Sequence, residues 1–518
     1  MNLLSFLPKA DIIYSSLKAR PFLHLFIAMV GTSIWHYILI RTSIFLLSLI
    51  APLSTLYSLV RAVFLLPLHF PRVLEIWLAL EAVFYLAFYL PRQAHLQKAA
   101  VHPPTACRKD RRRLFRQCNN NIPEPEQYLT KWFQDATLTE IKRENLKDFF
   151  RWAFLNTGEV DPAYDGELEE YVGQMEKLLG RKVEPGRGNV KCLRLTLDKV
   201  EMLHRSLTWY LCVFVVDTVA WFYLRHYSFQ FHRTSFLAVF PLRPFSLLAT
   251  NRSPAKTLTY WHRPHTSKTR LPVLFIHGIG IGLYQYIDFL ADLNAENSQS
   301  SPDGQVGIIA LEILSVSSRI TGEAMAKDEM CAEIACILNA HGWQRLVLVS
   351  HSYGSVVATH LIHAPQTARK VGSILFVDPV AFLLHLPHVA YNFTYRKPTH
   401  ANEHLLSYFG AKDMGTSHTL FRRFFWAENI LWKEDIQDHR VCVVLSGRDR
   451  IIDAKVVGAY LTGADDWSLE LDIWEDGVWE GDMLEVLWFA KLDHGQAFGG
   501  DKARKKLVDV VRRFCVEV

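Results

Sequence analysis

Two long stretches near the amino terminus contain only uncharged side chains and histidines. Residues 21–40 and 42–60 lack Asp, Glu, Lys and Arg, and each can cross about 30 Å of hydrocarbon as a helix. A third apolar stretch, 73–90, includes Glu75 and Glu81, which are costly at a bilayer centre unless they face another helix. We therefore expect residues 1–95 to form membrane-anchoring helices, with two crossings favoured over a buried helical bundle.

The placement of basic residues around this block predicts its orientation. Basic residues accumulate on the cytoplasmic side of membrane helices. Lys9, Lys18 and Arg20 precede the apolar block, and a basic cluster at 108–116 follows it. We therefore expect an integral membrane protein with both flanks, and hence its carboxy-terminal domain, in the cytosol. The sequence does not specify which organelle membrane holds it. A glycosylation sequon at Asn392 would matter only in a lumen.

The middle of the chain, residues 96–235, is expected to be a helical accessory region. Thr137 and Glu140 have the spacing of a capping box, and apolar residues then recur at helical intervals up to Ala153, which predicts an amphipathic helix. Residues 206–224 are apolar except for Asp217. They fit a membrane span, a helix resting on the bilayer or a core helix, and the last two are favoured.

Beyond residue 270, short apolar runs alternate with longer helical patterns. The expected strands are 273–276, 306–311, 346–349, 374–377, 441–445 and 484–489. The expected helices are 283–293, 324–340, 355–362 and 502–514. This alternation is typical of a mostly parallel sheet with helices on both faces. We assign 236–518 to such an α/β domain, in which functional groups lie on loops at the carboxyl ends of strands.

The segment 346–360 has the pattern of a sharp turn between a strand and a helix. The run 346–349 leads into Ser350-His351-Ser352-Tyr353-Gly354 and then a helix. Such a turn strains its central serine and needs small residues two positions before and two after it. Ser350 stands where glycine is usual and is small enough. Ser352 is therefore the candidate nucleophile, although this five-residue pattern alone also recurs by chance.

A second turn directly follows the expected strand 273–276, with the sequence His277-Gly278-Ile279-Gly280. A serine that attacks an ester carbonyl needs preorganised donors for the oxyanion that forms. We expect the backbone N–H groups of Ile279 and Tyr353 to supply them. Gly278 and Gly280 would leave the Ile279 N–H group free, and His277 would support the loop. An ordinary glycine turn without this function also fits the sequence.

A nucleophilic serine also needs a base and an acid that orients the base. His494 follows the last expected strand, and Asp449 follows the strand before it. The chain order Ser352, Asp449, His494 is the order that a triad has on this kind of sheet. Asp378, after the strand 374–377, is the competing acid, and we rank Asp449 first.

Four motifs together resemble those of the α/β-hydrolase superfamily. They are HGIG at 277–280, SHSYG at 350–354, SGRD at 446–449 and DHG at 493–495. The resemblance covers roughly 240–518 and implies an eight-stranded core sheet and a serine esterase or lipase mechanism. With the amino-terminal block, the layout resembles membrane-anchored fungal hydrolase-like proteins.

A long insertion separates the strands 374–377 and 441–445, where these folds carry a cap. The expected cap, 380–438, is rich in aromatic residues and contains four basic residues suited to a head group or phosphate: Arg396, Lys397, Arg422 and Arg423. Together with a membrane anchor, this cap favours an ester of an apolar acyl chain delivered laterally from the bilayer. A small water-soluble ester is the alternative.

Composition narrows the function classes further. The near balance of 57 basic and 52 acidic residues argues against nucleic-acid binding. The eight cysteines lack Cys-x-x-Cys spacing, so no zinc site or disulfide scaffold is indicated, and we expect no metal or organic cofactor. The hypothesis is a membrane-anchored serine hydrolase that cleaves carboxylic esters. Its expected partners are a lipid or acyl-ester substrate and the bilayer, and its oligomeric state stays open. The alternatives are a non-catalytic membrane scaffold or lipid-binding protein, and an acyltransferase using the same serine.

Overall fold

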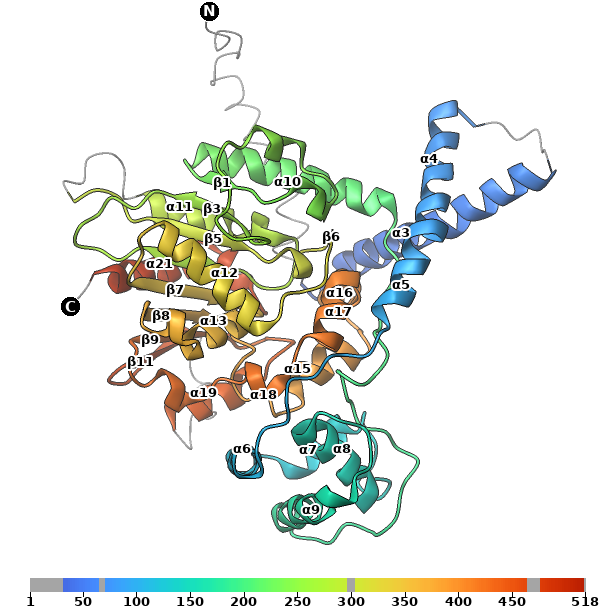
Figure 1. The fold of residues 1–518 in the computed structure, drawn as a ribbon, viewed down its shortest axis with the longest axis vertical. Helices are drawn as coiled ribbons and strands as arrows, with labels where there is room; N and C mark the ends of the chain where they lie inside the picture. The colour runs from blue at the N-terminus through green and yellow to red at the C-terminus, as the bar shows by residue number, and fades with distance from the viewer. Residues whose placement is uncertain (1–30, 65–69, 296–302, 464–475, 517–518) are drawn as a thin grey trace, which may run out of the picture.

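The computed structural model of this 518-residue chain describes residues 31–64, 70–295, 303–463 and 476–516 (Figure 1). Lys9, Lys18, Arg20 and the first half of the run 21–40 lie outside the described residues. The carboxy-terminal part of the chain is built around one large sheet. In Figure 1 the blue and teal helices of residues 34–179 lie to the right of and below this sheet, and the green helix of residues 207–226 lies above it.

Nine strands among the described residues form this sheet, in the spatial order β1-β3-β5-β4-β7-β8-β9-β11-β10. The six strands from β5 to β11 are parallel, whereas β1, β3 and β10 are antiparallel to their neighbours. In spatial order, their bounds are Gln230–His232, Thr259–Arg263, Ile308–Glu312, Val273–Ile276, Leu346–His351, Val371–Val377, Val441–Ser446, Leu484–Phe489 and Asp476–Glu480. A separate pair joins β2 (Val239–Phe240) to β6 (Ile320–Thr321).

The six strands expected from apolar runs are all present, and they are the six parallel ones. Such runs form strands that are buried on both faces, as β4 and β9 are along their whole length. The expected number of eight core strands is wrong, because the large sheet contains nine of the strands in the described part of the chain. The additional strands β1, β3 and β10 mix polar with aromatic side chains and gave no apolar run to detect.

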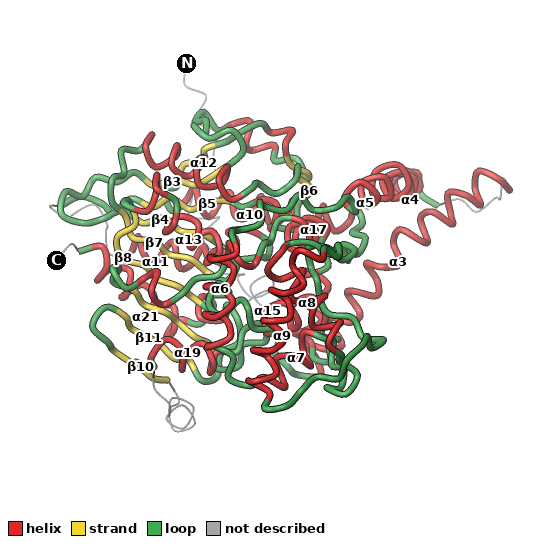
Figure 2. The backbone as a smooth tube through the Cα atoms, turned by 60° about the horizontal axis from the view of Figure 1, so that its bottom comes forward, coloured by secondary structure: helices red, strands yellow, loops and turns green. Residues whose placement is uncertain are grey.

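Helices cover both faces of the sheet (Figure 2). On one face pack α12 (Lys327–Ala340), α13 (Gly354–His363) and α19 (Ala454–Thr462), and on the other pack α11 (Ile287–Ala295) and α21 (Asp501–Cys515). Strand side chains alternate between the two cores, since Leu274 of β4 lies in the first and Phe275 in the second. Short helical turns complete this domain: η3 Phe236–Ala238, η4 Pro244–Leu248, η5 Gly282–Tyr286, η6 Leu314–Val316, α14 Pro365–Ala368 and η10 Gln496–Phe498.

The segment between β8 and β9, here named the β8–β9 insertion (residues 378–440), is helical and includes the expected cap range. Its elements are α15 His388–Ala390, η7 Tyr391–Tyr395, α16 Ala401–Leu405, η8 Leu406–Ala411, α17 Met414–Arg422, α18 Trp426–Asn429 and η9 Lys433–Ile436. Many of its aromatic residues, Phe421 and Trp432 among them, belong to the hydrophobic core.

The middle region forms an aromatic-rich helical unit of α6 (Arg108–Asn120), α7 (Pro125–Trp132), α8 (Arg143–Leu155), η2 (Pro162–Tyr164) and α9 (Asp165–Leu179). Two indole N–H groups, one from each part, form hydrogen bonds between this unit and the β8–β9 insertion. Trp132 donates to the His385 carbonyl at 3.2 Å, and Trp426 donates to the Ala153 carbonyl at 3.0 Å. The middle region therefore packs directly beside the insertion.

The helix expected at Thr137 begins later. Glu140 does accept the Thr137 N–H at 2.9 Å, but this contact closes a turn, and α8 begins only at Arg143. The Asn145 side chain there accepts the Lys142 N–H at 3.1 Å and so satisfies a donor at the helix start.

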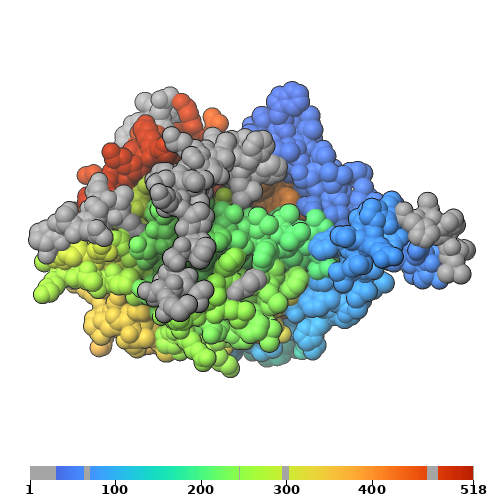
Figure 3. Space-filling model, turned by 90° about the horizontal axis from the view of Figure 1, so that it is seen from above, coloured from blue at the N-terminus to red at the C-terminus, as the bar shows by residue number. Residues whose placement is uncertain are grey.

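Three stretches of helix among the described residues are long and apolar enough to cross a membrane: 34–63, 72–96 and 207–226. They correspond to α3 (Ile34–Phe64), to α4 (Arg72–Val83) continued by η1 (Phe84–Tyr89) and α5 (Leu90–Leu96), and to α10 (Leu207–His226). The helices α3 and α4 form one end of the molecule (Figures 1 and 3). Arg41, which separates the two uncharged runs in the sequence, does not interrupt the helix: α3 runs through it, because no glycine or proline stops the helix there.

Both acids of the third apolar stretch face other helices. Glu75 accepts the Tyr57 hydroxyl of α3 at 2.8 Å. Glu81 is fully buried and accepts the N–H groups of Leu207 and Thr208 at 2.8 Å each. A carboxylate at the start of a helix satisfies its free donors and complements its dipole, so Glu81 joins α4 to α10.

Candidate active site

Ser352 lies in the turn between β7 and α13, in the backbone conformation expected of a strained nucleophile. Its φ is +50°, in the left-handed region that non-glycine residues rarely adopt. A Cβ on Gly354 would lie 2.4 Å from the Ile276 carbonyl oxygen, so this position needs glycine. Ser350 is fully buried, and its hydroxyl finds no hydrogen-bond partner in the described residues. It fits the turn through its small size.

The turn is held by Ser355, a contact that the sequence did not predict. Its hydroxyl donates to the Ser352 carbonyl at 2.6 Å. The same oxygen accepts the N–H groups of Val380 and Ala381 at 3.1 and 3.2 Å. The start of the β8–β9 insertion is thereby tied to the serine turn.

The structure brings Ser352, His494 and Asp449 into one hydrogen-bonded series. The Ser352 hydroxyl lies 2.8 Å from His494 Nε2, and His494 Nδ1 lies 2.6 Å from Asp449 Oδ2. The other Asp449 oxygen accepts the N–H groups of Ile451 and Ile452 at 2.7 and 3.0 Å. These bonds fix the carboxylate, which in turn orients the imidazole toward the serine.

Asp378, the competing acid, lies nearby with different partners. It accepts the Ser446 N–H at 3.0 Å, the Ser446 hydroxyl at 3.1 Å and the Gly495 N–H at 2.7 Å. Burial and the neighbouring Asp449 raise the pKa of Asp378 to about 7. The acid bonded to the imidazole is thus Asp449, and Asp378 supports the loops that carry Asp449 and His494.

The surroundings of His494 strongly favour its protonated form. Burial alone would lower the pKa of His494, but the Asp449 carboxylate, with smaller contributions from Asp378 and Asp493, raises it to about 9. A base must be neutral to accept a proton. Any reaction that uses His494 as a base is therefore expected to accelerate as the pH rises toward 9.

The glycine turn after β4 lies beside the serine. A Cβ on Gly278 would be 2.8 Å from the Ser352 Cβ, so glycine permits this close approach. Ile279 and Tyr353 both line the cavity at the serine, and their backbone N–H groups have no acceptor in the described part of the chain. Both are thus available to a bound oxyanion.

His277 is fully buried beneath this turn. Burial lowers its pKa to about 4, so the ring is neutral at physiological pH. Its Nε2 accepts the Ile313 N–H at 2.9 Å, and its Nδ1 donates to the Gly278 carbonyl at 2.7 Å. These contacts brace the turn against the loop after β5.

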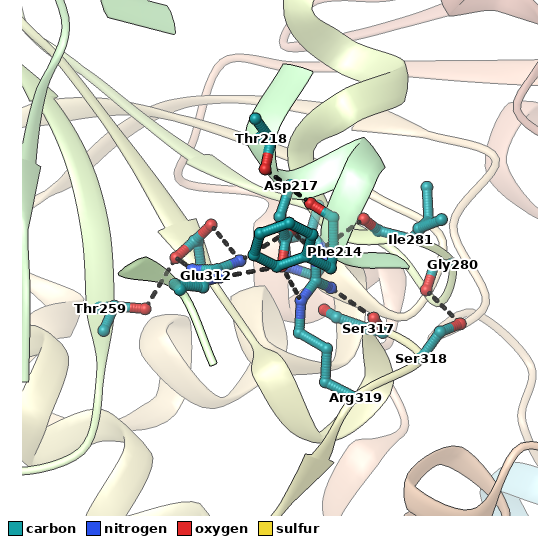
Figure 4. Close-up of polar contacts among 12 residues, drawn as sticks. Phe214, Asp217, Thr218, Thr259, Gly280, Ile281, Glu312, Ser317, Ser318 and Arg319 are labelled. Carbon is teal, nitrogen blue, oxygen red and sulfur yellow. Dashed lines mark hydrogen bonds and ion pairs between the residues drawn. The ribbon is translucent and has the colours of Figure 1, made fainter. Parts of the chain in front are cut away.

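A buried group of four charged residues reaches the same turn from α10 (Figure 4). Asp217 of α10 pairs with Arg243 and with Arg319, and Arg243 pairs with Glu312 at 2.7 Å. We name these four residues the α10 charge cluster. Asp217 faces the α/β domain through these pairs. Because α10 is also long and apolar enough to cross a membrane, its place relative to the bilayer stays a prediction.

The α10 charge cluster contacts the backbone of the glycine turn. Arg319 donates to the Ile281 carbonyl at 3.3 Å and to the Ser317 carbonyl. The neighbouring Ser318 hydroxyl donates to the Gly280 carbonyl at 3.1 Å (Figure 4). The position of the turn that carries Ile279 therefore depends on α10, a link that only the folded structure reveals.

A cavity of 730 Å³ opens at Ser352 and His494. Its walls are mostly apolar and come from α3, α10, the β8–β9 insertion and the middle region. The middle region contributes Trp132, Trp152 and Leu195, for which the sequence gave no functional signal. Arg396, Lys397, Arg422 and Arg423, which we expected at a head group, do not line the cavity.

Two clusters of described residues bring three possible metal-ligand atoms within 4.8 Å of one another. One is Asp378, Asp449 and His494, whose carboxylates already accept the hydrogen bonds given above. The other is His232, His262 and His341 at the edge of the sheet. There the Tyr260 hydroxyl bonds one ring nitrogen each of His232 and His341, and the rings of His262 and His341 lie 3.9 Å apart. We assign this second cluster to packing.

Comparison with known proteins identifies the class of the domain. Residues 272–409 match the family model described as the alpha/beta hydrolase fold. With the parallel sheet and its covering helices, this match shows that the carboxy-terminal domain has the α/β-hydrolase fold. No curated protein sequence matches the chain. The resemblance to membrane-anchored fungal proteins stays a prediction.

Solved structures with similar folds are distant in sequence. A bacterial membrane phospholipase A is 12% identical, with 59% of this chain and 94% of that chain covered and a TM-score of 0.36. Naproxen esterase from Bacillus subtilis is 11% identical, with 50% and 87% covered and a TM-score of 0.33. A putative lipase from Acinetobacter baumannii is 12% identical, with 58% and 95% covered and a TM-score of 0.36.

Proposed function

We propose that this chain is a membrane-anchored serine hydrolase that cleaves carboxylic esters of lipids through an acyl-enzyme on Ser352. The observation that carries the proposal is the series Ser352–His494–Asp449, with distances of 2.8 and 2.6 Å, at an apolar cavity. A strained serine, a base within reach and an acid that orients the base are the parts that nucleophilic catalysis needs.

In the first half of the reaction, neutral His494 takes the Ser352 proton while the serine oxygen bonds to the ester carbonyl carbon. The oxyanion that forms accepts hydrogen bonds from the N–H groups of Ile279 and Tyr353. Asp449 stabilises the imidazolium. As the tetrahedral intermediate collapses, His494 returns the proton to the leaving alcohol, and the acyl group stays on Ser352.

In the second half, water replaces the alcohol. His494 accepts a proton from water as the water oxygen bonds to the acyl carbon. The second tetrahedral intermediate then releases the carboxylic acid, and His494 returns the proton to Ser352. Every proton stays within the residues, ester and water named here, so the proposed steps require no metal or organic cofactor.

We propose further that the helices before residue 96 anchor the protein and that the α/β domain faces the cytosol. Trp35, Phe45 and Leu56 of α3 are exposed, and large exposed apolar surfaces mark membrane or partner contacts. The basic cluster at 108–116, which follows these helices, supports the cytosolic orientation.

Hydrolysis of a short soluble ester, p-nitrophenyl butyrate, tests the catalytic proposal. We expect Ser352→Ala and His494→Ala each to lower kcat by roughly 10³-fold or more. The matched control is His363→Ala, whose partly exposed ring pairs with Asp435 away from the cavity. Wild-type activity that persists in Ser352→Ala contradicts the proposal. A folded wild type that cleaves no ester also contradicts it and favours a non-catalytic lipid-binding protein.

A further inference from the structure

The cavity at Ser352 is bordered by two of the apolar helices. From α3 it is lined by Ile40, Ser43, Leu46, Leu47 and Ile50, and from α10 by Thr208, Trp209, Cys212 and Val216. The α3 residues recur every three or four positions, so one face of this helix borders the cavity. A helix long and apolar enough to cross a membrane thus forms a wall of the space into which the serine points.

The lining of the cavity includes exposed residues of both helices. Leu46 lines the cavity and is nevertheless 57% exposed, and Cys212 lines it and is exposed as well. We name the opening between Leu46 and Cys212 the α3–α10 mouth. Exposed apolar side chains flank it on both helices, with Phe45 on α3 and Leu211 and Val215 on α10. An acyl chain can pass from a bilayer into this opening without crossing a polar surface.

The described lining of the cavity contains no lysine or arginine. Its acidic and imidazole side chains are those of Asp493, His351 and His494. Asp493 accepts the N–H groups of His494 and Arg450 at 2.8 and 3.2 Å. Burial lowers the pKa of His351 well below its usual range, so its ring carries no positive charge at neutral pH. His494, the proposed base, must also be neutral to act.

Three of the basic residues of the β8–β9 insertion are engaged elsewhere. Arg422 donates to the carbonyls of Lys98 and Asp198 at 2.6 and 2.9 Å. Arg423 pairs with Glu323 at 2.6 Å. Arg396 donates to a backbone carbonyl at 2.8 Å. A phosphate group in the cavity would therefore lose its hydration without gaining a lysine or arginine partner, which is unfavourable whenever His494 is in the neutral form that the reaction needs.

From these observations we infer the substrate class: an ester of a long acyl chain with an uncharged head group, such as an acylglycerol, which enters from the bilayer through the α3–α10 mouth. This inference rests on the proposed serine hydrolase function. It excludes phosphate-bearing lipids as preferred substrates. The uncharged hydroxyls of the head group match the neutral polar side chains of the lining, including Gln285, Thr394 and Asn402.

The first test compares head groups at constant acyl chain. The full-length protein in detergent micelles is given monooleoylglycerol, oleoyl-lysophosphatidylcholine or oleoyl-lysophosphatidic acid, with p-nitrophenyl butyrate as the measure of an intact site. We expect kcat/KM for the glyceride to exceed that for either phosphate-bearing ester by at least about tenfold. Equal or reversed preference, with p-nitrophenyl butyrate cleaved, overturns the inference alone. Failure to cleave any of the four esters counts against the proposed function itself.

The second test blocks the mouth. Cys212→Trp places a large ring at the opening, and Phe222→Trp places the same ring at an exposed position farther along α10 that does not line the cavity. We expect Cys212→Trp to lower the ratio of monooleoylglycerol to p-nitrophenyl butyrate hydrolysis by about tenfold, because the long chain must pass the ring. Phe222→Trp should keep the wild-type ratio. The same ratio in both variants contradicts entry between α3 and α10.

Discussion

At the scale of single residues, two buried carboxylates surround one imidazole and perform different tasks. Asp449 bonds His494 directly, whereas Asp378 bonds the backbone of Ser446 and Gly495. Both negative charges raise the pKa of His494, which reaches about 9. The pH dependence of the reaction is therefore expected to report on Asp378 even though this residue does not touch the ring.

Replacing Asp378 by asparagine removes one of these charges. In the wild type, we expect kcat/KM for p-nitrophenyl butyrate to rise between pH 7 and 9 as His494 loses its proton. In Asp378→Asn the pKa of His494 falls, so the acidic limb of the profile should move to lower pH by roughly one unit. Thermal unfolding at each pH checks that the variant is folded. A limb that stays in place or moves upward would show that Asp378 does not influence the base.

At the scale of elements, the glycine turn of the proposed oxyanion site depends on a helix that is distant in sequence. Asp217 of α10 binds Arg319, and Arg319 binds the Ile281 carbonyl two residues beyond Ile279. Removing one partner from a buried ion pair leaves uncompensated charge. Damage to α10 should thus affect both stability and the chemical step.

The substitution Asp217→Asn tests this link. We expect about 3–5 kcal/mol lower stability, the usual effect of breaking a buried pair, and a fall in kcat larger than any rise in KM, because oxyanion donors act in the transition state. The control is Thr218→Ala, whose hydroxyl donates within α10 to the Phe214 carbonyl. Denaturant unfolding and ester kinetics provide the two readouts. An unchanged kcat in folded Asp217→Asn would show that α10 does not influence the chemical step at the site.

Which strands could be predicted from the sequence depended on how much of each strand is buried. The six parallel strands were predictable because both faces are buried, which leaves nearly continuous apolar runs. The loops that carry Ser352, Asp449 and His494 were predictable too, because each of them comes shortly after one of these strands. The antiparallel strand β3, by contrast, mixes Tyr260, Trp261 and His262, and it pairs with β1 and β5, which are far away in sequence. The head-group role expected for Arg422 failed because charge alone does not reveal which carbonyls a guanidinium meets after folding.

At the scale of the whole molecule, the apolar amino-terminal helix α3 packs against the α/β domain and its β8–β9 insertion. Tyr37 of α3 contacts His404 of the β8–β9 insertion with ring centres 5.6 Å apart, and Ile40 packs against Ala401. Further along α3, residues line the cavity. The cavity at Ser352 is therefore complete only with α3 in place, a property that the sequence could not show because it depends on where this helix packs.

Membrane attachment is testable on membranes from cells that express the full chain. Washing with alkaline carbonate removes proteins bound only by charge or by other proteins. Because α3 exposes large apolar side chains such as Trp35 and Phe45, we expect the protein to stay in the pellet and to be released by detergent. Release by carbonate alone would show that these helices pack against protein rather than lipid.

Labelling with a fluorophosphonate probe, followed by mass spectrometry of the modified peptide, tests the central claim most directly. The probe phosphonylates serines that a neighbouring base activates. The proposed mechanism predicts one dominant adduct on Ser352 in detergent-solubilised wild type and none there in His494→Ala, with His363→Ala labelled to the same extent as the wild type. Folded wild-type protein that forms no adduct, or an adduct on another serine that survives in His494→Ala, would contradict it.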